Sequence, residues 1–300
     1  MKTTLASRSV IGHSRAMPLR HVALAVLVAA LWGCNFIAIR WGLDAYPPLL
    51  LIALRFAISA APVMLVPRPA IPWPKLVTLS LFLFVLQFAF LFAGMELGMT
   101  PGMASILMQS QAFLTPAFAM VALGERVTAR QLVGGGVALA GLGVVATTVD
   151  ATMTVIGFVL TLAAAASWAI GNVMQKSIGP VDRFALTLWL SLIPPVPALI
   201  ASYMLEGDVV AAILNTGWRD VGALLYLAIV STWFGYVAWG RLLSLYPMAV
   251  VSPYALLIPI FGMASSALVF GERFGVERLA GAALVMLGVA VATLSLRRRS

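Results

Sequence analysis

The sequence predicts an all-α integral membrane protein whose ten transmembrane helices form two inverted five-helix repeats. The first observation behind this prediction is composition: 62% of the 300 residues are hydrophobic, 10% are charged, and the mean hydropathy is +1.03. A protein surrounded by water could not cover its surface with so few polar residues. The second is that the chain divides into ten long apolar runs. The third is that Gly-Glu-Arg occurs twice, at 124–126 and 271–273.

Each apolar run is long enough for one membrane-spanning helix, which needs about 20 residues. Clusters of charged residues, Pro and Gly separate the runs, as they do at the ends of helices. We expect spans at 21–39, 48–66, 76–95, 101–122, 130–148, 154–174, 184–204, 219–240, 247–269 and 277–296. The connections between them are short, so the prediction leaves no soluble domain.

The first 20 residues are polar and basic, and they lead into an apolar run without an evident cleavage site. This pattern is typical of a cytoplasmic tail and not of a removed leader peptide. We therefore expect three parts: a cytoplasmic N-terminal tail at 1–20, a first repeat at 21–148, and an inverted second repeat at 154–296.

The lysine and arginine residues indicate the orientation of the chain, because cytoplasmic loops carry an excess of them. With the N-terminus in the cytoplasm, most of the nineteen lie in tails and loops on the cytoplasmic side. Those on the other side or inside a span are Arg40, Arg219, Arg273, Arg278 and Arg55. Both termini are therefore predicted to be cytoplasmic.

The two Gly-Glu-Arg stretches relate the two halves of the chain. A shift of 147 positions aligns Glu125 with Glu272, and it also aligns Leu132, Gly134 and Gly141 with identical residues of the second half. Each stretch lies between the fourth and fifth spans of its half. Because five is an odd number, the second half enters the membrane from the opposite side, which makes the repeat inverted.

Ten spans in two halves, each with a (Leu/Phe)-Gly-Glu-Arg loop followed by a glycine-rich last helix, resemble the EamA-type transporters of the drug/metabolite transporter superfamily. The likeness runs from about Met17 to the last span. Within that superfamily, segments 32–56, 87–113 and 157–172 are similar to those of bacterial exporters of O-acetylserine and cysteine. Residues 1–16 have no counterpart in this resemblance, so Met1 and Met17 are both candidate starts.

The resemblance implies a secondary transporter of the bacterial inner membrane that exports small zwitterionic amino-acid metabolites, O-acetylserine and cysteine first among them. It would work by alternating access around a central cavity between the repeats, as other inverted-repeat transporters do. The alternative is a broader exporter of amino acids, other metabolites or drugs, since one fold serves many substrates. Protons or another counter-transported solute are candidate coupling partners, and no cofactor is implied.

Two Trp/Asn pairs are the first candidate substrate-binding residues. Trp32 and Asn35 are three residues apart in the first span, and Trp168 and Asn172 are four apart in the sixth, so each pair shares one helix face. Pseudosymmetry would place the pairs across the central axis from one another. The amides would then bind a carboxylate or ammonium group between indole walls. Alternatively, they hydrogen-bond to neighbouring helices while the indoles fill gaps.

Three further polar residues are candidates for substrate binding: Gln87 in the third span, Gln111 in the fourth and Tyr254 in the ninth. We prefer Gln111 to Gln109 because Gln111 belongs to a stripe at helical spacing. That stripe consists of Ala104, Met108, Gln111 and Thr115. Hydrogen bonding between helices is again the alternative role.

Arg55 is the only basic residue deep inside a predicted span. A lone intramembrane arginine requires an anion, a group of carbonyls or water. Glu96, at the outer end of the third span, is the acidic residue nearest to the same depth. We expect Arg55 to form a structural ion pair with Glu96, or to contact backbone carbonyls, in preference to binding substrate; the pair would have a structural or gating role.

The sequence argues against several other functions. The basic residues lie singly between apolar runs and form no face for nucleic acid. The two histidines, His13 and His21, are near the N-terminus, and no nucleophile, metalloprotease or P-loop motif is present, so an enzyme is not expected. The single cysteine, Cys34, excludes an intramolecular disulfide. No span carries a well-buried Asp or Glu, which disfavours cationic substrates and leaves proton coupling without an obvious carrier.

Overall fold

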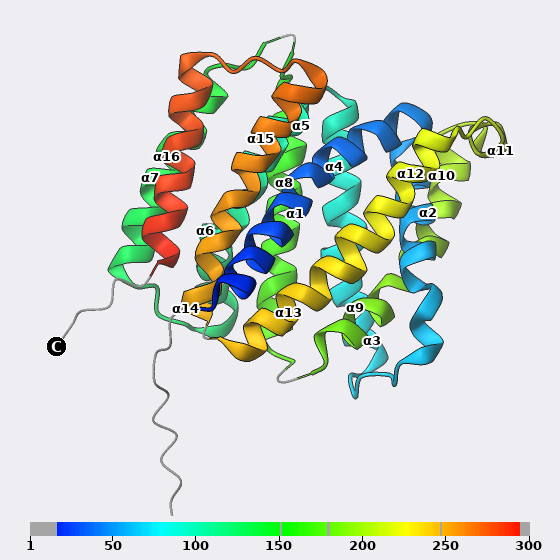
Figure 1. Cartoon of the computed structure of the whole chain (residues 1–300), viewed down its shortest axis with the longest axis horizontal. Helices are drawn as coiled ribbons and strands as arrows, with labels where there is room; N and C mark the ends of the chain where they lie inside the picture. The colour runs from blue at the N-terminus through cyan, green and yellow to red at the C-terminus, as the bar shows by residue number, and fades with distance from the viewer. Residues whose placement is uncertain (1–16, 151, 179–180, 247, 295–300) are drawn as a thin grey trace, which may run out of the picture.

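The computed structural model describes residues 17–150, 152–178, 181–246 and 248–294, and all secondary-structure elements in these ranges are helical (Figure 1). Ten helical stretches in the described ranges are long and apolar enough to cross a membrane. The prediction of ten spans is confirmed, and most span ends lie within a few residues of those expected.

Five spans form the first repeat, and three of them contain a short segment that is not α-helical. They are α1 (Leu19–Ala45); α2 (Pro48–Ala60) with η1 (Ala61–Leu65); α3 (Trp73–Ser80) with η2 (Leu81–Leu86) and α4 (Gln87–Glu96); α5 (Pro101–Leu107) with η3 (Met108–Ser110) and α6 (Gln111–Leu123); and α7 (Ala129–Ala146). The segment η2 is π-helical, whereas η1 and η3 are 3-10 turns.

The other five spans form the second repeat in the same order. They are α8 (Val155–Lys176); α9 (Arg183–Ser191) with α10 (Pro195–Leu205); α12 (Trp218–Leu225) with η4 (Tyr226–Phe234) and α13 (Gly235–Leu245); η5 (Ser252–Leu256) with α15 (Leu257–Phe270), preceded by the short α14 (Met248–Val251); and α16 (Val276–Thr293). The short helix α11 (Val209–Leu214) lies in the connection between the seventh and eighth spans.

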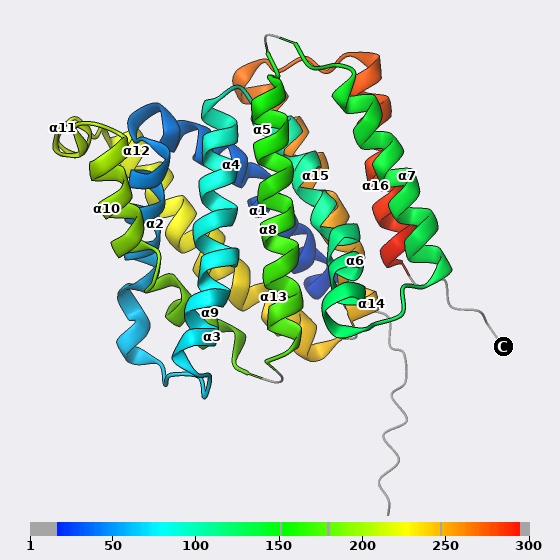
Figure 2. The same cartoon turned by 180° about the vertical axis from the view of Figure 1, so that it is seen from behind.

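The bundle has two ends, which we name by their loops. The junction end carries residues 147–150 and 152–154 between the repeats, together with the loops from α1 to α2 and from α15 to α16. The terminal end carries the start of α1 and the end of α16 (Figures 1 and 2). Helices α1, α13 and α15 cross the face seen in Figure 1, and α8, α4 and α6 cross the face seen in Figure 2. These are corresponding spans of the two repeats, as inverted symmetry requires.

Gly124 and Gly271 end the fourth span of each repeat, as the sequence predicts. Their φ angles are 66° and 65°, in the left-handed region that glycine adopts without steric cost and that commonly ends helices. The glutamates that follow these two glycines differ in their contacts. Glu125 pairs with Lys176 at 2.5 Å at the terminal end, whereas Glu272 accepts hydrogen bonds at the start of α5, including one of 3.0 Å from the Gly102 amide.

The last helices of the two repeats, α7 and α16, pack closely through glycines. A Cβ atom added to Gly134 would lie 2.5 Å from the carbonyl oxygen of Gly288, and one added to Gly141 would lie 2.7 Å from that of Gly281. A shift of 147 converts one contact into the other, so the two helices meet through a self-complementary surface. Small residues at such an interface let helix backbones approach closely in the membrane.

Candidate functional site

Two π-helical segments occupy matching positions in the two repeats. The shift of 147 carries residues 81–86 of η2 onto 228–233, which lie inside η4. The 3-10 segment η3 is carried onto 255–257, which overlaps η5. Helix breaks of this kind persist in membranes where neighbouring groups bond to the freed backbone, and π segments are frequent at functional sites. The third and eighth spans therefore indicate a candidate site to which each repeat contributes one π segment.

Side chains of the first helix of each repeat bond to the π segment of the other repeat. The indole Nε1 of Trp32 in α1 donates to the carbonyl oxygen of Ser231 in η4 at 3.0 Å. The hydroxyl of Ser167 in α8 donates to the carbonyl oxygen of Phe82 in η2 at 2.7 Å. Both bonds link the two repeats, so α1 and α8 hold the irregular segments in place from opposite faces of the bundle.

Aromatic side chains surround Trp32. Its ring lies edge-on to that of Tyr236, with centroids 5.8 Å apart, and tilted against that of Trp239, at 5.4 Å. The eighth span reaches this position because Gly235 has no side chain: a Cβ atom there would be 2.5 Å from Trp32 Nε1. The Tyr236 side chain keeps 38% of its surface exposed, although it lies in the interior of the eighth span.

Asn172, Gln111 and Thr115 form a polar network between α8 and α6. The Asn172 amide nitrogen lies 3.0 Å from the side-chain oxygen of Gln111 and 3.5 Å from the Thr115 hydroxyl. Gln111 and Thr115 are therefore on the helix face that the sequence stripe predicts. Gln109 points elsewhere, since its amide donates to the carbonyl oxygen of Ala255 at 3.2 Å.

The other predicted site residues have fewer polar contacts. Asn35 has a buried side-chain oxygen without a hydrogen-bond partner in the described chain. Gln87 is buried at the point where η2 passes into α4, and Trp168 packs against the main apolar core. Tyr254 packs beside a separate small cluster of Ala25, Leu242 and Val251.

The two Trp/Asn pairs do not share one hydrogen-bonded site in the described residues. Trp32 bonds to η4 of the eighth span, whereas Asn172 bonds to α6 of the fourth span. Each pair joins its own helix to the opposite repeat. Their role in binding substrate stays a prediction.

Arg55 does not pair with Glu96, and this expectation was wrong. The Arg55 side chain is 4% exposed, and its Nε and Nη1 have no hydrogen-bond partner in the described chain. Nη2 lies 3.5 Å from the Thr232 hydroxyl, at the limit of a hydrogen bond. The guanidinium carbon lies 4.2 Å from the centre of the Phe88 ring, which is a cation–π contact.

Glu96 instead pairs with Arg40 at the junction end, where Arg40 Nη1 lies 3.8 Å from its carboxylate. Arg40 also pairs with Asp44 at 3.0 Å, and Asp44 pairs with Arg219 of the other repeat at 3.3 Å. The predicted depth of Arg55 in the membrane suggested it as the partner of Glu96. The observed partner, Arg40, lies on α1, and the sequence of the second span gives no information on how α1 and α4 pack.

Further bonds between the repeats fasten the junction end. Tyr46 donates to Thr216 at 2.9 Å, and the Glu206 carboxylate accepts from the amides of Leu49 and Leu50 at 2.7 and 3.1 Å, at the start of α2. At the terminal end, Glu125 and Lys176 form an exposed pair, and His21 Nδ1 lies 2.5 Å from the Tyr246 hydroxyl. The junction end is therefore joined by more bonds between the repeats.

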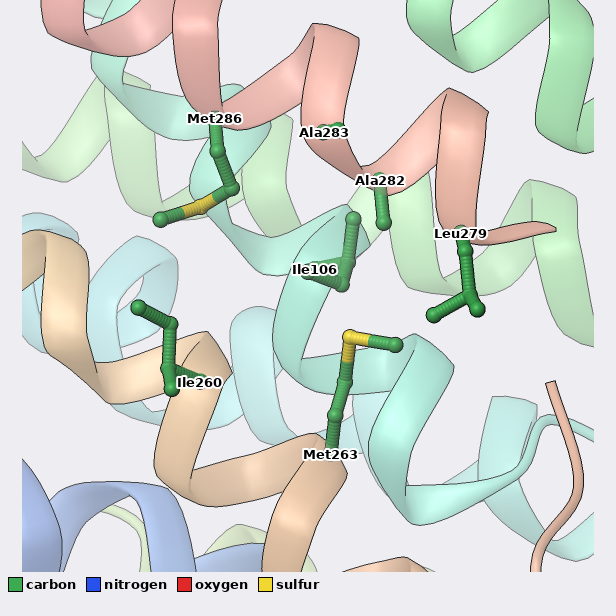
Figure 3. Close-up of a pocket in the computed structure, with 7 residues that line it drawn as sticks. All are labelled: Ile106, Ile260, Met263, Leu279, Ala282, Ala283 and Met286. Carbon is green, nitrogen blue, oxygen red and sulfur yellow. The ribbon is translucent and has the colours of Figure 1, made fainter. Parts of the chain in front are cut away.

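Two pockets of about 270 Å³ lie away from these residues. The pocket in Figure 3 is lined by apolar side chains of α5, α15 and α16, among them Ile106, Met263 and Met286. The second lies at the terminal end, between the loop that contains Arg68 and the start of α9 at Asp182. Neither pocket contains a predicted site residue, and the apolar lining of the first suits contact with lipid.

Residues 19–147 and 155–294 each match the profile of the EamA-like transporter family. The chain belongs to the EamA-like transporter family. The two matched stretches correspond to the two five-helix repeats, because the first ends just after α7 and the second begins with α8. A solved crystal structure with a TM-score of 0.66 and 19% sequence identity, which covers 94% of this chain and 98% of that one, shares the fold.

Relatives of this EamA-like transporter extend over nearly the whole chain. A protein of Salmonella typhimurium named "Probable amino-acid metabolite efflux pump" is 40% identical over 288 residues, covering 92% of this chain and 95% of the relative. A protein of the same name in Escherichia coli is 39% identical over 287 residues, with the same coverage. A "Probable terminal-alkyne amino-acid exporter" of Streptantibioticus cattleyicolor is 26% identical and covers 88% of this chain.

This EamA-like transporter is a multi-pass protein of the inner membrane and not an enzyme. In the described chain, Arg55 has two buried nitrogens and Asn35 a buried oxygen without a hydrogen-bond partner. The sequence prediction missed the surroundings of Arg55, namely Phe88 and Thr232. Both are ordinary residues of membrane helices, so no sequence signal could have identified them.

Proposed function

We propose that this EamA-like transporter exports small zwitterionic amino-acid metabolites from the cytoplasm, with O-acetylserine and cysteine as its main substrates. The names of the two enterobacterial relatives, at 40% and 39% identity over nearly their full length, support export of amino-acid metabolites. Such zwitterions carry little net charge near neutral pH. Amide, hydroxyl and aromatic groups together with one fixed charge can therefore bind them.

The observation that carries this proposal is the matched pair of π segments, η2 and η4, each bonded to the first helix of the other repeat. Inverted-repeat transporters commonly bind substrate near the midplane where interrupted helices of the two repeats meet. The predicted binding residues lie on the spans that meet there: Trp32 and Asn35 on α1, Gln87 on α4, Gln111 on α6, and Trp168 and Asn172 on α8. Tyr254 is on η5, at the break in the ninth span.

The proposal includes alternating access, with the junction end closed in this structure. The bonds of Asp44 with Arg219 and of Tyr46 with Thr216 would break when that end opens. We assign the terminal end to the cytoplasm, because basic residues gather there as the positive-inside rule requires. They are Arg20, Arg68, Lys75, Arg126, Arg130, Lys176, Arg183 and Arg241. Both termini would then be cytoplasmic, and the structure would be closed to the periplasm.

The described spans have no carboxylate near their middle that could carry a coupling proton. Their carboxylates lie near span ends, as Asp44, Glu96, Asp220 and Glu277 do. Export in exchange for another solute, or down the substrate's own gradient, requires no membrane-embedded carboxylate. A dissipated proton gradient should therefore leave most of the export intact.

The test is export from cells that overproduce the protein. We expect external cysteine and O-acetylserine to rise above those of cells with an empty vector, and tolerance of excess cysteine to improve. Export of only aromatic amino acids, nucleosides or drugs would support the broader exporter and refute the substrate assignment. Failure to export any amino-acid metabolite, with the protein present in the membrane, would refute the proposed function itself.

A further inference from the structure

Arg55 and Arg278, the buried arginines among the described residues, differ sharply in their partners. Arg278, at the start of α16, is 7% exposed and bonds to the hydroxyl of Thr148 at 3.3 Å and its carbonyl oxygen at 2.9 Å, to the hydroxyl of Thr152, and to the carboxylate of Asp150 at 2.9 Å. Arg55 is 4% exposed, yet two of its three nitrogens have no partner in the described chain. The nitrogens of Arg278 thus have hydrogen-bond and ion-pair partners, as expected of a buried arginine with a structural role. Those of Arg55 do not.

Arg55 lies within the hydrocarbon layer, where a charge without partners is costly. It is the eighth residue of a span that runs from Pro48 to Leu65. None of the ion pairs in the described chain includes it. The carboxylates of Asp44 and Glu96 pair instead with Arg40 and Arg219 at the junction end. The hydroxyl of Thr232 donates to the carbonyl of Leu227 at 2.9 Å and can accept from one nitrogen of Arg55, but it supplies no negative charge.

The surroundings of Arg55 leave hydrogen-bonding capacity free. The rings of Phe88 and Phe56 lie 4.2 and 5.3 Å from the guanidinium carbon and stabilise the charge through their faces. A ring face accepts no strong hydrogen bond from Nε or Nη1. A carboxylate would supply both the negative charge and two oxygens that match the planar guanidinium.

Groups suited to the rest of an amino acid lie beside Arg55. Thr232, the hydrogen-bond partner of Arg55, lies four residues before Tyr236 in the eighth span, about one helical turn away. Tyr236 contacts Trp32, which is one helical turn from Asn35, whose buried oxygen is an unused acceptor. Aromatic faces and an amide oxygen are groups that bind an ammonium. The chemistry therefore fits a molecule that carries a carboxylate and an ammonium on adjacent atoms.

We propose that Arg55 binds the α-carboxylate of the exported amino-acid metabolite. This assignment rests on the proposed function, and it replaces the structural role that the sequence favoured for Arg55. It defines the substrate class: a free α-carboxylate is required, whereas the side chain of the metabolite is recognised elsewhere. Esters, amides and decarboxylated analogues are excluded from tight binding.

Binding of L-cysteine and of its ethyl ester to the purified full-length protein, under reducing conditions, tests the assignment. We expect the wild-type protein to bind the acid about 30-fold or more tightly than the ester, as for removal of one partner of a buried charge pair. Arg55→Gln should lose this preference by weakening acid binding alone. Arg68→Gln, at an arginine of the terminal end that bonds to the carbonyl of Ile71 at 3.2 Å, is the matched control and should bind as the wild type does.

Arg55→Lys covers the case in which Arg55→Gln fails to fold. Lysine keeps the charge but loses the planar pair of donors, so the preference for the acid should shrink and not vanish. Equal binding of acid and ester by the wild type would overturn the assignment, as would full acid preference in either Arg55 variant. If the wild type binds neither form of cysteine, cysteine is refuted as a substrate, and that result alone does not decide the role of Arg55. The acid and the ester of an amino acid that the protein does export are then compared in the same way, and that comparison decides the role of Arg55.

Discussion

The indole of Trp32 and the backbone carbonyl of Ser231 form a hydrogen bond of 3.0 Å that joins the first span of one repeat to the π segment of the other. In the corresponding connection, the Ser167 hydroxyl of the second repeat donates to the Phe82 carbonyl in the π segment of the first repeat, at 2.7 Å. These bonds tie the two halves together at the level where the helices of the third and eighth spans are irregular. Each π segment is therefore bonded to the first helix of the other repeat.

Replacing Trp32 by Phe should weaken this connection. The variant removes the N–H donor and leaves the Ser231 carbonyl without it, at a cost of about 1 kcal/mol. We expect a lower melting temperature of the purified protein and a several-fold lower export rate. Trp239→Phe is the matched control, because Trp239 contacts the same ring without a side-chain hydrogen bond in the described chain. Equal effects of both substitutions would argue against a special role for the bond.

The network of Asn172 with Gln111 and Thr115 should be energetically coupled. Asn172→Ala and Gln111→Ala are each expected to reduce export without loss of protein from the membrane. The double variant should lose less stability than the sum of the single variants, by about 0.6 kcal/mol, the average for such bonds in a membrane protein. A double-mutant cycle of unfolding free energies measures this value, and strict additivity would show that the two side chains act independently.

The glycine contact between α7 and α16 should be sensitive to a single methyl group. A Cβ atom at Gly288 would lie 2.4 Å from the carbonyl oxygen of Gly134, so Gly288→Ala must push the helices apart, at about 1 to 3 kcal/mol. Gly143, on α7, has no atom within 4 Å of an added Cβ, and Gly143→Ala should not destabilise the protein. Thermal unfolding of both variants checks this, and an unaffected Gly288→Ala protein would contradict the packing described here.

The connection between the repeats should respond to acid through Asp150. The Thr152 hydroxyl and amide donate to its carboxylate at 2.7 Å each and the Met153 amide at 3.0 Å, and Arg278 pairs with it, so the pKa of Asp150 is held well below its usual range. A lowered pKa means that the charged form stabilises the folded protein above about pH 4 and that this contribution is lost as the pH falls below it.

Melting temperatures of the wild type and of Asp150→Asn, measured from pH 7 to pH 3, test this dependence. The variant should be less stable near neutrality, and the difference should narrow below about pH 4. Thr147→Val, in the same connection but without a bond to Asp150, serves as a control. A difference between wild type and Asp150→Asn that stays constant with pH would contradict the explanation.

Much of the fold follows from the sequence because membrane helices have a strong hydropathy signal. The ten spans and the glycines that end the fourth helix of each repeat could be predicted, since Gly124 and Gly271 precede charged residues after long apolar runs. The π segments could not. Residues 81–86 read LFLFVL, without the Pro or Gly that usually marks a helix break. In the folded chain this segment packs against α8, where a Cβ atom added to Gly171 would lie 2.3 Å from the Leu83 side chain.

The candidate site was predicted less completely, for a related reason. Helical spacing correctly placed Gln111 and Thr115 on one face, because that relation lies within a single helix. The partner of Glu96 depends on how α1 and α4 pack, and depth in the membrane alone suggested Arg55 instead of Arg40. Spacing gives the faces of helices, whereas contacts between helices require the assembled bundle.

Transport by the purified protein in liposomes tests the central claim most directly. Proteoliposomes filled with unlabelled cysteine should take up labelled cysteine by exchange, liposomes without protein should not, and external O-acetylserine should compete. This result would establish the protein as a transporter of cysteine-pathway metabolites. Proteoliposomes that exchange neither cysteine nor O-acetylserine, while the protein is folded and inserted, would contradict the account.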